Sequence, residues 1–299
     1  MKLFQNRIHR GMFLTILGGI SWGFSGTCGQ YVFAHYEVSS MWLSCVRLLY
    51  GGLLLTLLAL LKNPTDVRSI LCDRRAVLRL FFYGTCGLMM VQYAYLTGIY
   101  WTNAATTTVL QNLGPVMVMM LACLLSRRLP SKAEFFALLL AVFGVFLLAT
   151  GGNPGQMMLS PKGLFWGIMS AVGVVFYTML PRPLLTKWSR DTVVGVGMLI
   201  GGIVLNLFAR SWTMSVSLPV DGWLAVAAVV LMGTVISFSL VTQGIAEIGP
   251  VRTSMLNAVE PVTATVLSVL WLGTSFAVTD IVAFIAILAT VVLLAKSES

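Results

Sequence analysis

Apolar segments of about 20 residues, separated by short polar connections, follow one another along the whole chain. A helix of that length crosses a hydrocarbon core of roughly 30 Å. Only 10% of the 299 residues are charged, against about 25% in soluble globular proteins. That is too few charges to cover a water-facing surface of this size. The sequence therefore predicts an all-α polytopic membrane protein.

The apolar pattern predicts ten transmembrane helices, five in each half of the chain. Their expected limits are 11–34, 40–61, 77–99, 104–126, 133–150, 162–181, 192–209, 221–244, 251–273 and 277–295. Connections that contain glycine and proline, such as GGNPG at 151–155, separate them. The first segment is longer than the roughly 7–15 apolar residues of a signal peptide, so we expect it to be an uncleaved helix.

Lysine and arginine are distributed unequally between the two predicted sides of the membrane. Sixteen of the 19 lie at the termini or on the connections of one side, and only Lys162 and Arg210 lie on the other. Because cytoplasmic loops are enriched in basic residues, both termini are predicted to be cytoplasmic, in a bacterial inner (plasma) membrane. The same bias accounts for the net charge of +9 without a nucleic-acid partner.

The chain resembles itself when it is shifted by 146 residues: without a gap, Gly87 meets Gly233 and Pro115 meets Pro261. Each half would hold five spans, an odd number, so the second half enters the membrane from the opposite side. Inverted repeats of this kind recur in secondary transporters, with the substrate site between them. The two predicted five-helix repeats are residues 1–150 and 151–299.

Two prolines interrupt predicted spans at equivalent positions. Proline has no amide hydrogen, so each leaves the carbonyl four residues earlier without its helical partner. Polar residues precede both on one face of the helix: Gln111 and Asn112 before Pro115, and Asn257 and Glu260 before Pro261. Paired kinks with polar faces predict a central cavity. Ordinary helix packing is the open alternative, because such kinks are common in membrane bundles.

Glu260 and Arg47 are the two ionisable residues deep inside predicted spans. A charge at the bilayer centre costs about 3 kcal/mol or more, so such residues face the protein interior and often mark a transport pathway. One interpretation is a structural ion pair between Arg47 and Glu260. The other makes Glu260 a site for a proton or for a substrate amine. The sequence leaves both open.

Further polar and aromatic residues inside the spans complete the predicted substrate site. It comprises Trp22, Gln92, Tyr95, Gln111, Asn112, Tyr177, Gln243, Asn257 and Glu260. The five cysteines lack metal-type spacing, and both histidines lie near span ends. We expect no metal, no cofactor and no catalytic residue, because motifs such as H-E-x-x-H and G-x-S-x-G do not occur. The expected partners are a small-molecule substrate, the lipid bilayer and protons as candidate coupling ions, whereas the oligomeric state stays open.

The sequence resembles a known family, the EamA-type branch of the drug/metabolite transporter superfamily. The resemblance covers the whole chain and rests on Trp22-Gly23, Arg47, Pro115 and Glu260-Pro261 in their order and spacing. Two departures leave the coupling mechanism open. Members often carry Gly-Glu at the end of the fourth and ninth spans, where this chain has Arg127-Arg128 and Gly273-Thr274, and Gly114-Pro115 stands opposite Glu260-Pro261.

The resemblance implies ten spans in two five-helix halves and a transporter of small metabolites, often an exporter of amino acids or related compounds. Our leading hypothesis is a secondary carrier that works by alternating access between its two inverted halves. A channel, a membrane-embedded enzyme, and a carrier for a drug, a vitamin or a nucleotide sugar are the alternatives. No residue identifies the substrate or the direction of transport.

Overall fold

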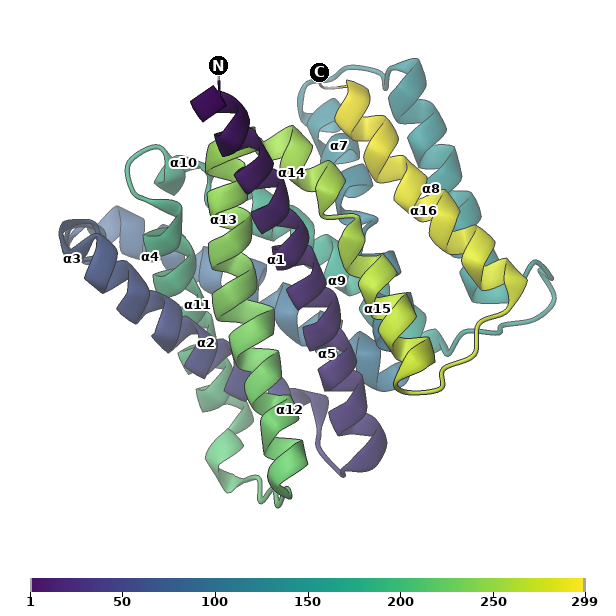
Figure 1. The fold of residues 1–299 in the computed structure, drawn as a ribbon, viewed down its shortest axis with the longest axis horizontal. Coiled ribbons are helices and arrows are strands. Elements are labelled where there is room, and N and C mark those ends of the chain that lie inside the picture. The colour runs from purple at the N-terminus through teal and green to yellow at the C-terminus, as the bar shows by residue number, and fades with distance from the viewer. Residues whose placement is uncertain (1, 298–299) are drawn as a thin grey trace.

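Every regular element is a helix within residues 2–297, which the computed structural model describes (Figure 1). The all-α prediction is therefore confirmed. The terminal Met1, Glu298 and Ser299, in the predicted cytoplasmic tails, lie outside the described residues. The elements are α1 (Lys2–His35), α2 (Ser40–Lys62), α3 (Pro64–Cys72), α4 (Arg74–Phe82), η1 (Tyr83–Met89), α5 (Met90–Trp101), α6 (Ala104–Gln111), α7 (Gly114–Leu125), α8 (Lys132–Thr150), α9 (Pro161–Met179), α10 (Arg182–Leu185), α11 (Arg190–Ala209), η2 (Ser211–Thr213), α12 (Val220–Val230), η3 (Leu231–Ile236), α13 (Ser237–Ile248), α14 (Pro250–Leu256), α15 (Val259–Leu270) and α16 (Val278–Ser297).

Seven helices of the described part are long and apolar enough to cross a membrane. They are Ser40–Lys62, Ala104–Leu125, Lys132–Thr150, Pro161–Leu185, Arg190–Ala209, Val220–Ile248 and Val278–Ala295. The other three predicted spans, 11–34, 77–99 and 251–273, fall on α1, on α4 with η1 and α5, and on α14 with α15. The total of ten spans stays a prediction.

Two helices contain a π-helical turn at matching places in the chain. The turn η1 joins α4 to α5 and contains Gly87, and η3 joins α12 to α13 and contains Gly233. These two glycines are the pair that the 146-residue shift aligns. A π turn widens the helix locally and often occurs at functional sites.

Two other helices are broken at matching places. The break between α6 and α7 falls at Asn112 and Leu113, and the break between α14 and α15 falls at Asn257 and Ala258. Each break precedes a proline, which cannot donate a backbone hydrogen bond and clashes with the preceding turn. The breaks leave backbone groups without their helical hydrogen bonds near the middle of two predicted spans. Such backbone is tolerated within a membrane where it lines a cavity.

Helices approach closely where a glycine of one helix faces the backbone of the other. The helix α2 lies along α11, and a Cβ atom on Gly52 would stand 2.7 Å from Leu199 Cα. From the other side, a Cβ on Gly202 would stand 2.7 Å from the Leu48 carbonyl carbon. Small residues allow such backbone contact in membrane bundles. At the opposite edge of the molecule α8 and α16 form a second pair, and α1 lies between the two pairs, beside α13 and α15 (Figure 1).

We expect Gly52→Ala to destabilise the protein by roughly 1–3 kcal/mol, because the added methyl group meets backbone atoms that cannot move alone. The apparent melting temperature in detergent measures this loss. Gly29→Ala is the control, since its Cβ would meet only the flexible end of Leu96, at 3.3 Å. Both changes give a helix the same intrinsic gain, so equal melting temperatures for the two variants would contradict the packing described.

Candidate functional site

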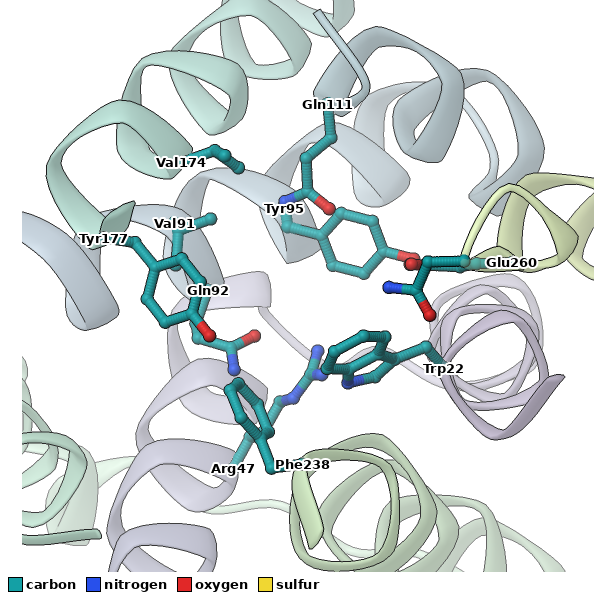
Figure 2. Close-up of a pocket in the computed structure, with 11 residues that line it drawn as sticks. Trp22, Arg47, Val91, Gln92, Tyr95, Gln111, Val174, Tyr177, Phe238 and Glu260 are labelled. Atoms are coloured by element: carbon teal, nitrogen blue, oxygen red, sulfur yellow. The ribbon is translucent and has the colours of Figure 1, made fainter. Parts of the chain in front are cut away.

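A cavity of about 190 Å³ lies where α1, α2, α5, α9 and α13 meet the two broken helices (Figure 2). Seven of the nine residues predicted as the substrate site line it: Trp22, Gln92, Tyr95, Gln111, Tyr177, Asn257 and Glu260. Arg47, predicted as an ion-pair partner, lines it as well, together with Val91, Val174 and Phe238. Residues far apart in the sequence thus share one chamber.

Arg47 reaches into this chamber from α2 and is only 3% exposed. Its Nε donates to Thr234 Oγ1 at 3.3 Å, and its Nη2 donates to the Gly233 carbonyl at 2.9 Å. Its Nη1 is buried and has no hydrogen-bond partner among the described residues. The turn η3 therefore holds the guanidinium by two of its three nitrogens.

The sequence left an ion pair between Arg47 and Glu260 open, and the described structure contains none between them within 4.0 Å. Among the described residues, the ion pairs within 4.0 Å join Arg10 to Glu247, Lys62 to Asp191 and Arg128 to Glu134. Arg47 instead bonds to neutral groups of η3, because these lie directly against α2. Both charges share the cavity without touching.

The Gly233 carbonyl accepts from a second side chain, since Trp22 Nε1 donates to it at 3.0 Å. Glycine is required at this position. A Cβ there would stand 3.1 Å from Arg47 Nη2 and 2.7 Å from Ser25 Cβ. The π turn thus fixes two of the residues that line the cavity.

Aromatic rings form one wall of the cavity. Phe238 packs edge-on against Trp22, with ring centroids 5.3 Å apart, and against Tyr177, at 6.3 Å. Tyr177 also stacks on the fully buried ring of Tyr83, at 6.2 Å. Such pairs add to the stability that burial provides. They give the cavity apolar surface beside the Gln92 amide and the Arg47 guanidinium (Figure 2).

Glu260 lies in the first turn of α15, beside the hydroxyl end of Tyr95 in the cavity (Figure 2). The neighbouring helix α1 comes close because of Gly23, where a Cβ would stand 2.6 Å from the Glu260 carbonyl oxygen. Asn257, in the break before α15, has a buried Oδ1 without a partner among the described residues. Glu260 and Asn257 both line the cavity, and Asn257 Oδ1 lies against α1, where a Cβ on Gly19 would stand 3.3 Å from it.

Two predicted site residues do not line this cavity. The side chain of Asn112 bonds to its own helix, with Nδ2 donating to the Thr108 carbonyl at 2.8 Å. Gln243 Nε2 donates to Glu247 Oε1 at 2.7 Å, which places it in the surface network around Arg10. Of the two prolines, Pro115 borders a neighbouring cavity and Pro261 is buried.

Three lining residues, Val91, Val174 and Phe238, were not predicted. Valine and phenylalanine occur throughout the apolar spans, so no sequence signal separates these three from residues that face lipid. As to metals, no group of three His, Cys, Asp or Glu side chains lies close enough to hold an ion within the described part of the chain.

The predicted external end of the bundle is tied together by Gln30 of α1. Its Oε1 accepts from Ala104 N at 2.9 Å and from Ser268 Oγ at 3.0 Å. Its Nε2 donates to Thr274 Oγ1 at 3.0 Å. One side chain thus links three segments. Nearby, the hydroxyls of Tyr31 and Tyr36 both donate to Asp221, and Tyr31 stacks on Trp271.

Toward the predicted cytoplasmic side the central cavity has two neighbours. One, of about 420 Å³, shares Val174 with it and includes Arg182 in its lining. The other, of about 150 Å³, shares Tyr177 with it and is lined also by Arg190. Two further cavities therefore share lining residues with the central cavity on the predicted basic side.

We expect the buried hydrogen bond between Tyr95 Oη and Thr108 Oγ1, at 2.9 Å, to contribute about 1 kcal/mol. A double-mutant cycle of Tyr95→Phe and Thr108→Val, followed by unfolding in detergent, measures the coupling between the two hydroxyls. The double variant should lose less stability than the two single losses add up to. Strict additivity would mean that the two hydroxyls do not interact.

Comparison with known proteins identifies the family. Two stretches of the chain, residues 9–150 and 161–296, match the EamA-like transporter family. YicL of Salmonella typhimurium, described as an uncharacterized inner membrane transporter, is 36% identical over 288 residues, which cover 95% of this chain and 95% of the relative. YyaM of Bacillus subtilis, described as an uncharacterized transporter, is 21% identical over 271 residues, which cover 87% of this chain and 86% of the relative.

The fold has a counterpart among solved structures. A crystal structure matches 99% of this chain and 99% of its own, with a TM-score of 0.62 at 18% sequence identity, which is a likeness of fold alone. The family match spans nearly the whole chain and agrees with the resemblance drawn from its motifs. This chain is a member of the EamA-like transporter family, a family of membrane transporters.

Proposed function

We propose that this protein is a secondary transporter that exports a small metabolite, such as an amino acid or a related amphipathic compound, by alternating access between two inverted halves. The observation that carries the proposal is the central cavity, in which α1, α2 and α5 meet α9, α13 and α15 around one cation, one carboxyl and an aromatic wall. Substrate sites of secondary transporters lie between repeats in this way.

The matched interruptions of the helices support ten spans in two inverted repeats, residues 1–150 and 151–299. The π turns η1 and η3, and the breaks after α6 and α14, recur at the shift of 146 residues within one or two positions. The family also matches the chain twice, once in each proposed half. An odd number of spans per half then inverts the second half, with both termini in the cytoplasm.

The size and lining of the cavity favour a small substrate with both polar and apolar parts. Its volume of about 190 Å³ lies below the roughly 300–1,000 Å³ of pockets for drug-sized ligands. A nucleotide sugar would need more room and several cations, whereas Arg47 is the one cation that lines the cavity in the described structure. Amides and the aromatic wall suit a compact amphipathic compound.

The direction of opening supports alternating access. The bonds of Gln30 join three segments at the predicted external end, and two further cavities share lining residues with the site toward the predicted cytoplasmic side. This arrangement corresponds to the inward-facing, loading state of an exporter. In the opposite state the Gln30 bonds would break and contacts on the cytoplasmic side would form.

Export is tested by comparing metabolites in the medium of cells that overexpress the protein with those of cells that lack it. A compound enriched by overexpression is then supplied to liposomes that contain the purified protein. Saturable flux supports a carrier. Single-channel conductance steps in a planar bilayer, or the absence of any enriched compound, would contradict the proposal.

We expect Glu260→Gln to reduce flux at least tenfold if the carboxylate takes part in transport, because the substitution removes the charge with little change in shape. Glu37→Gln is the control, since Glu37 is exposed between α1 and α2. Elution as a single peak in size-exclusion chromatography checks the fold of both variants. Unchanged flux in Glu260→Gln and in Glu260→Ala would remove Glu260 from the mechanism.

We expect Gln30→Ala to open the external end, because three hydrogen bonds that join α1 to α6, α15 and the following loop are lost. Val91→Cys, in a variant without the five native cysteines, reports access to the cavity. Labelling by a membrane-impermeant thiol reagent added outside should rise several-fold. Gln156→Ala, in an exposed loop, is the control. Equal labelling in both variants would contradict the proposal that the Gln30 hydrogen bonds close the external end.

A further inference from the structure

Two buried side-chain polar atoms in the described structure have no hydrogen-bond partner, and both belong to residues that line the central cavity. They are Nη1 of Arg47 and Oδ1 of Asn257. Buried polar groups in proteins are nearly always hydrogen-bonded, because an unmade bond costs the full loss of hydration. These two atoms are therefore side-chain groups of the cavity lining whose hydrogen bonds the described residues leave unmade.

The guanidinium of Arg47 is held so that its free nitrogen cannot turn to a protein acceptor. Its Nε and Nη2 bond to Thr234 and to the Gly233 carbonyl. Its Cζ lies 5.9 Å from the centroid of the Tyr95 ring, which covers one face. Figure 2 shows the guanidinium reaching between Gln92 and Trp22 toward the middle of the cavity. A group fixed in this way loses little freedom when a ligand binds.

This guanidinium has no carboxylate within 4.0 Å among the described residues, although Glu260 lines the same cavity and attracts its charge from farther away. Both of the bonds that Arg47 makes go to neutral oxygens, and none of the ion pairs in the described residues includes it. A buried cation is strongly stabilised by an anion with which it can form a charge-assisted hydrogen bond. Arginine suits a carboxylate in particular, because the guanidinium and the carboxylate are both planar.

We propose that Arg47 binds the carboxylate of the transported compound, which makes the substrate a small carboxylic acid. This inference rests on the proposed transport function and narrows its substrate. The Asn257 amide, which lines the same cavity, then bonds to a polar group on the same molecule, such as an amine or a hydroxyl group. The apolar part of the substrate lies against Trp22, Tyr177 and Phe238.

The assignment separates the roles of the two ionisable residues. Arg47 anchors the substrate from the side of η3, and Glu260 lines the same cavity without a contact ion pair among the described residues. The carboxylate must approach the guanidinium and keep away from Glu260, so a ligand with a single acid group at one end fits best. A dicarboxylate would place negative charge near Glu260 and should bind more weakly.

The experiment compares acids with their neutral carboxamides on the purified full-length protein in detergent. The matched pairs are L-phenylalanine with L-phenylalaninamide, L-leucine with L-leucinamide, and phenyllactate with phenyllactamide. Tryptophan fluorescence and thermal shift both report binding. We expect the acids to bind and at least one carboxamide to bind about 10-fold or more weakly than its acid, as the loss of a charge-assisted hydrogen bond predicts.

Variants then locate this preference. Arg47→Gln should remove the preference for the acid, and Arg47→Lys should keep part of it, because lysine retains the charge but not the planar fork. Arg68→Gln, an exposed arginine on α3, should leave the preference unchanged. If Arg47→Gln does not fold, the inference is tested by Arg47→Lys and by the acid–amide comparison on the unmodified protein.

Three results would overturn the inference: equal binding of acids and carboxamides, the same preference in Arg47→Gln, or binding of none of the acids. They are distinct from a failure of the transporter proposal, which the export experiment tests with no assumption about the substrate. Export of a compound without a carboxylate would keep the transporter and reject the role of Arg47. Failure to export any compound would reject the transporter itself.

Discussion

The hydrogen bond from Arg47 to the Gly233 carbonyl, 2.9 Å long, organises the centre of this molecule. It joins α2 to the π turn η3, 186 positions later in the chain. The same carbonyl accepts a hydrogen bond from Trp22 Nε1 of α1, so three helices meet at one backbone oxygen. A guanidinium in a bundle surrounded by lipid is tolerated only with such partners, since desolvation of an unpaired charge is very costly. The bond therefore shapes the cavity as well as stabilising the cation.

The two halves share a plan of interruptions but differ in their chemistry. At the shift of 146 residues, Glu260 corresponds to Gly114 and Arg47 corresponds to Val193. A Cβ on Gly114 would stand 2.7 Å from Val174 Cβ, so this position is packed against α9. Val193 is fully buried in an apolar cluster. Each charged residue thus occurs in one half only. A shared backbone plan can serve movement, while the asymmetric side chains can serve recognition and coupling.

The candidate site could be predicted in part, because a polar side chain in an apolar helix has few places to go. It must face the bundle interior or bond locally. Trp22, Gln92 and Glu260 face the shared cavity. Asn112 instead bonds locally, because its side chain donates to the Thr108 carbonyl of the same helix. The partner of Arg47 could not be predicted, since it depends on where η3 lies relative to α2 and not on the charge of distant residues.

The sequence by itself determined that this chain is helical and membrane-bound, and where most of its long helices lie, although not the short helix α3. A bilayer forces every span to satisfy its own backbone and to expose apolar side chains, and both requirements can be read locally. Proline likewise marked the two breaks, because its missing amide hydrogen is a property of one residue. Only the tertiary structure decided which polar groups share a cavity, that Arg47 bonds to η3 and not to Glu260, and that Val91 and Phe238 complete the lining. Those outcomes depend on contacts between helices, whose distances and rotations no single stretch of sequence contains.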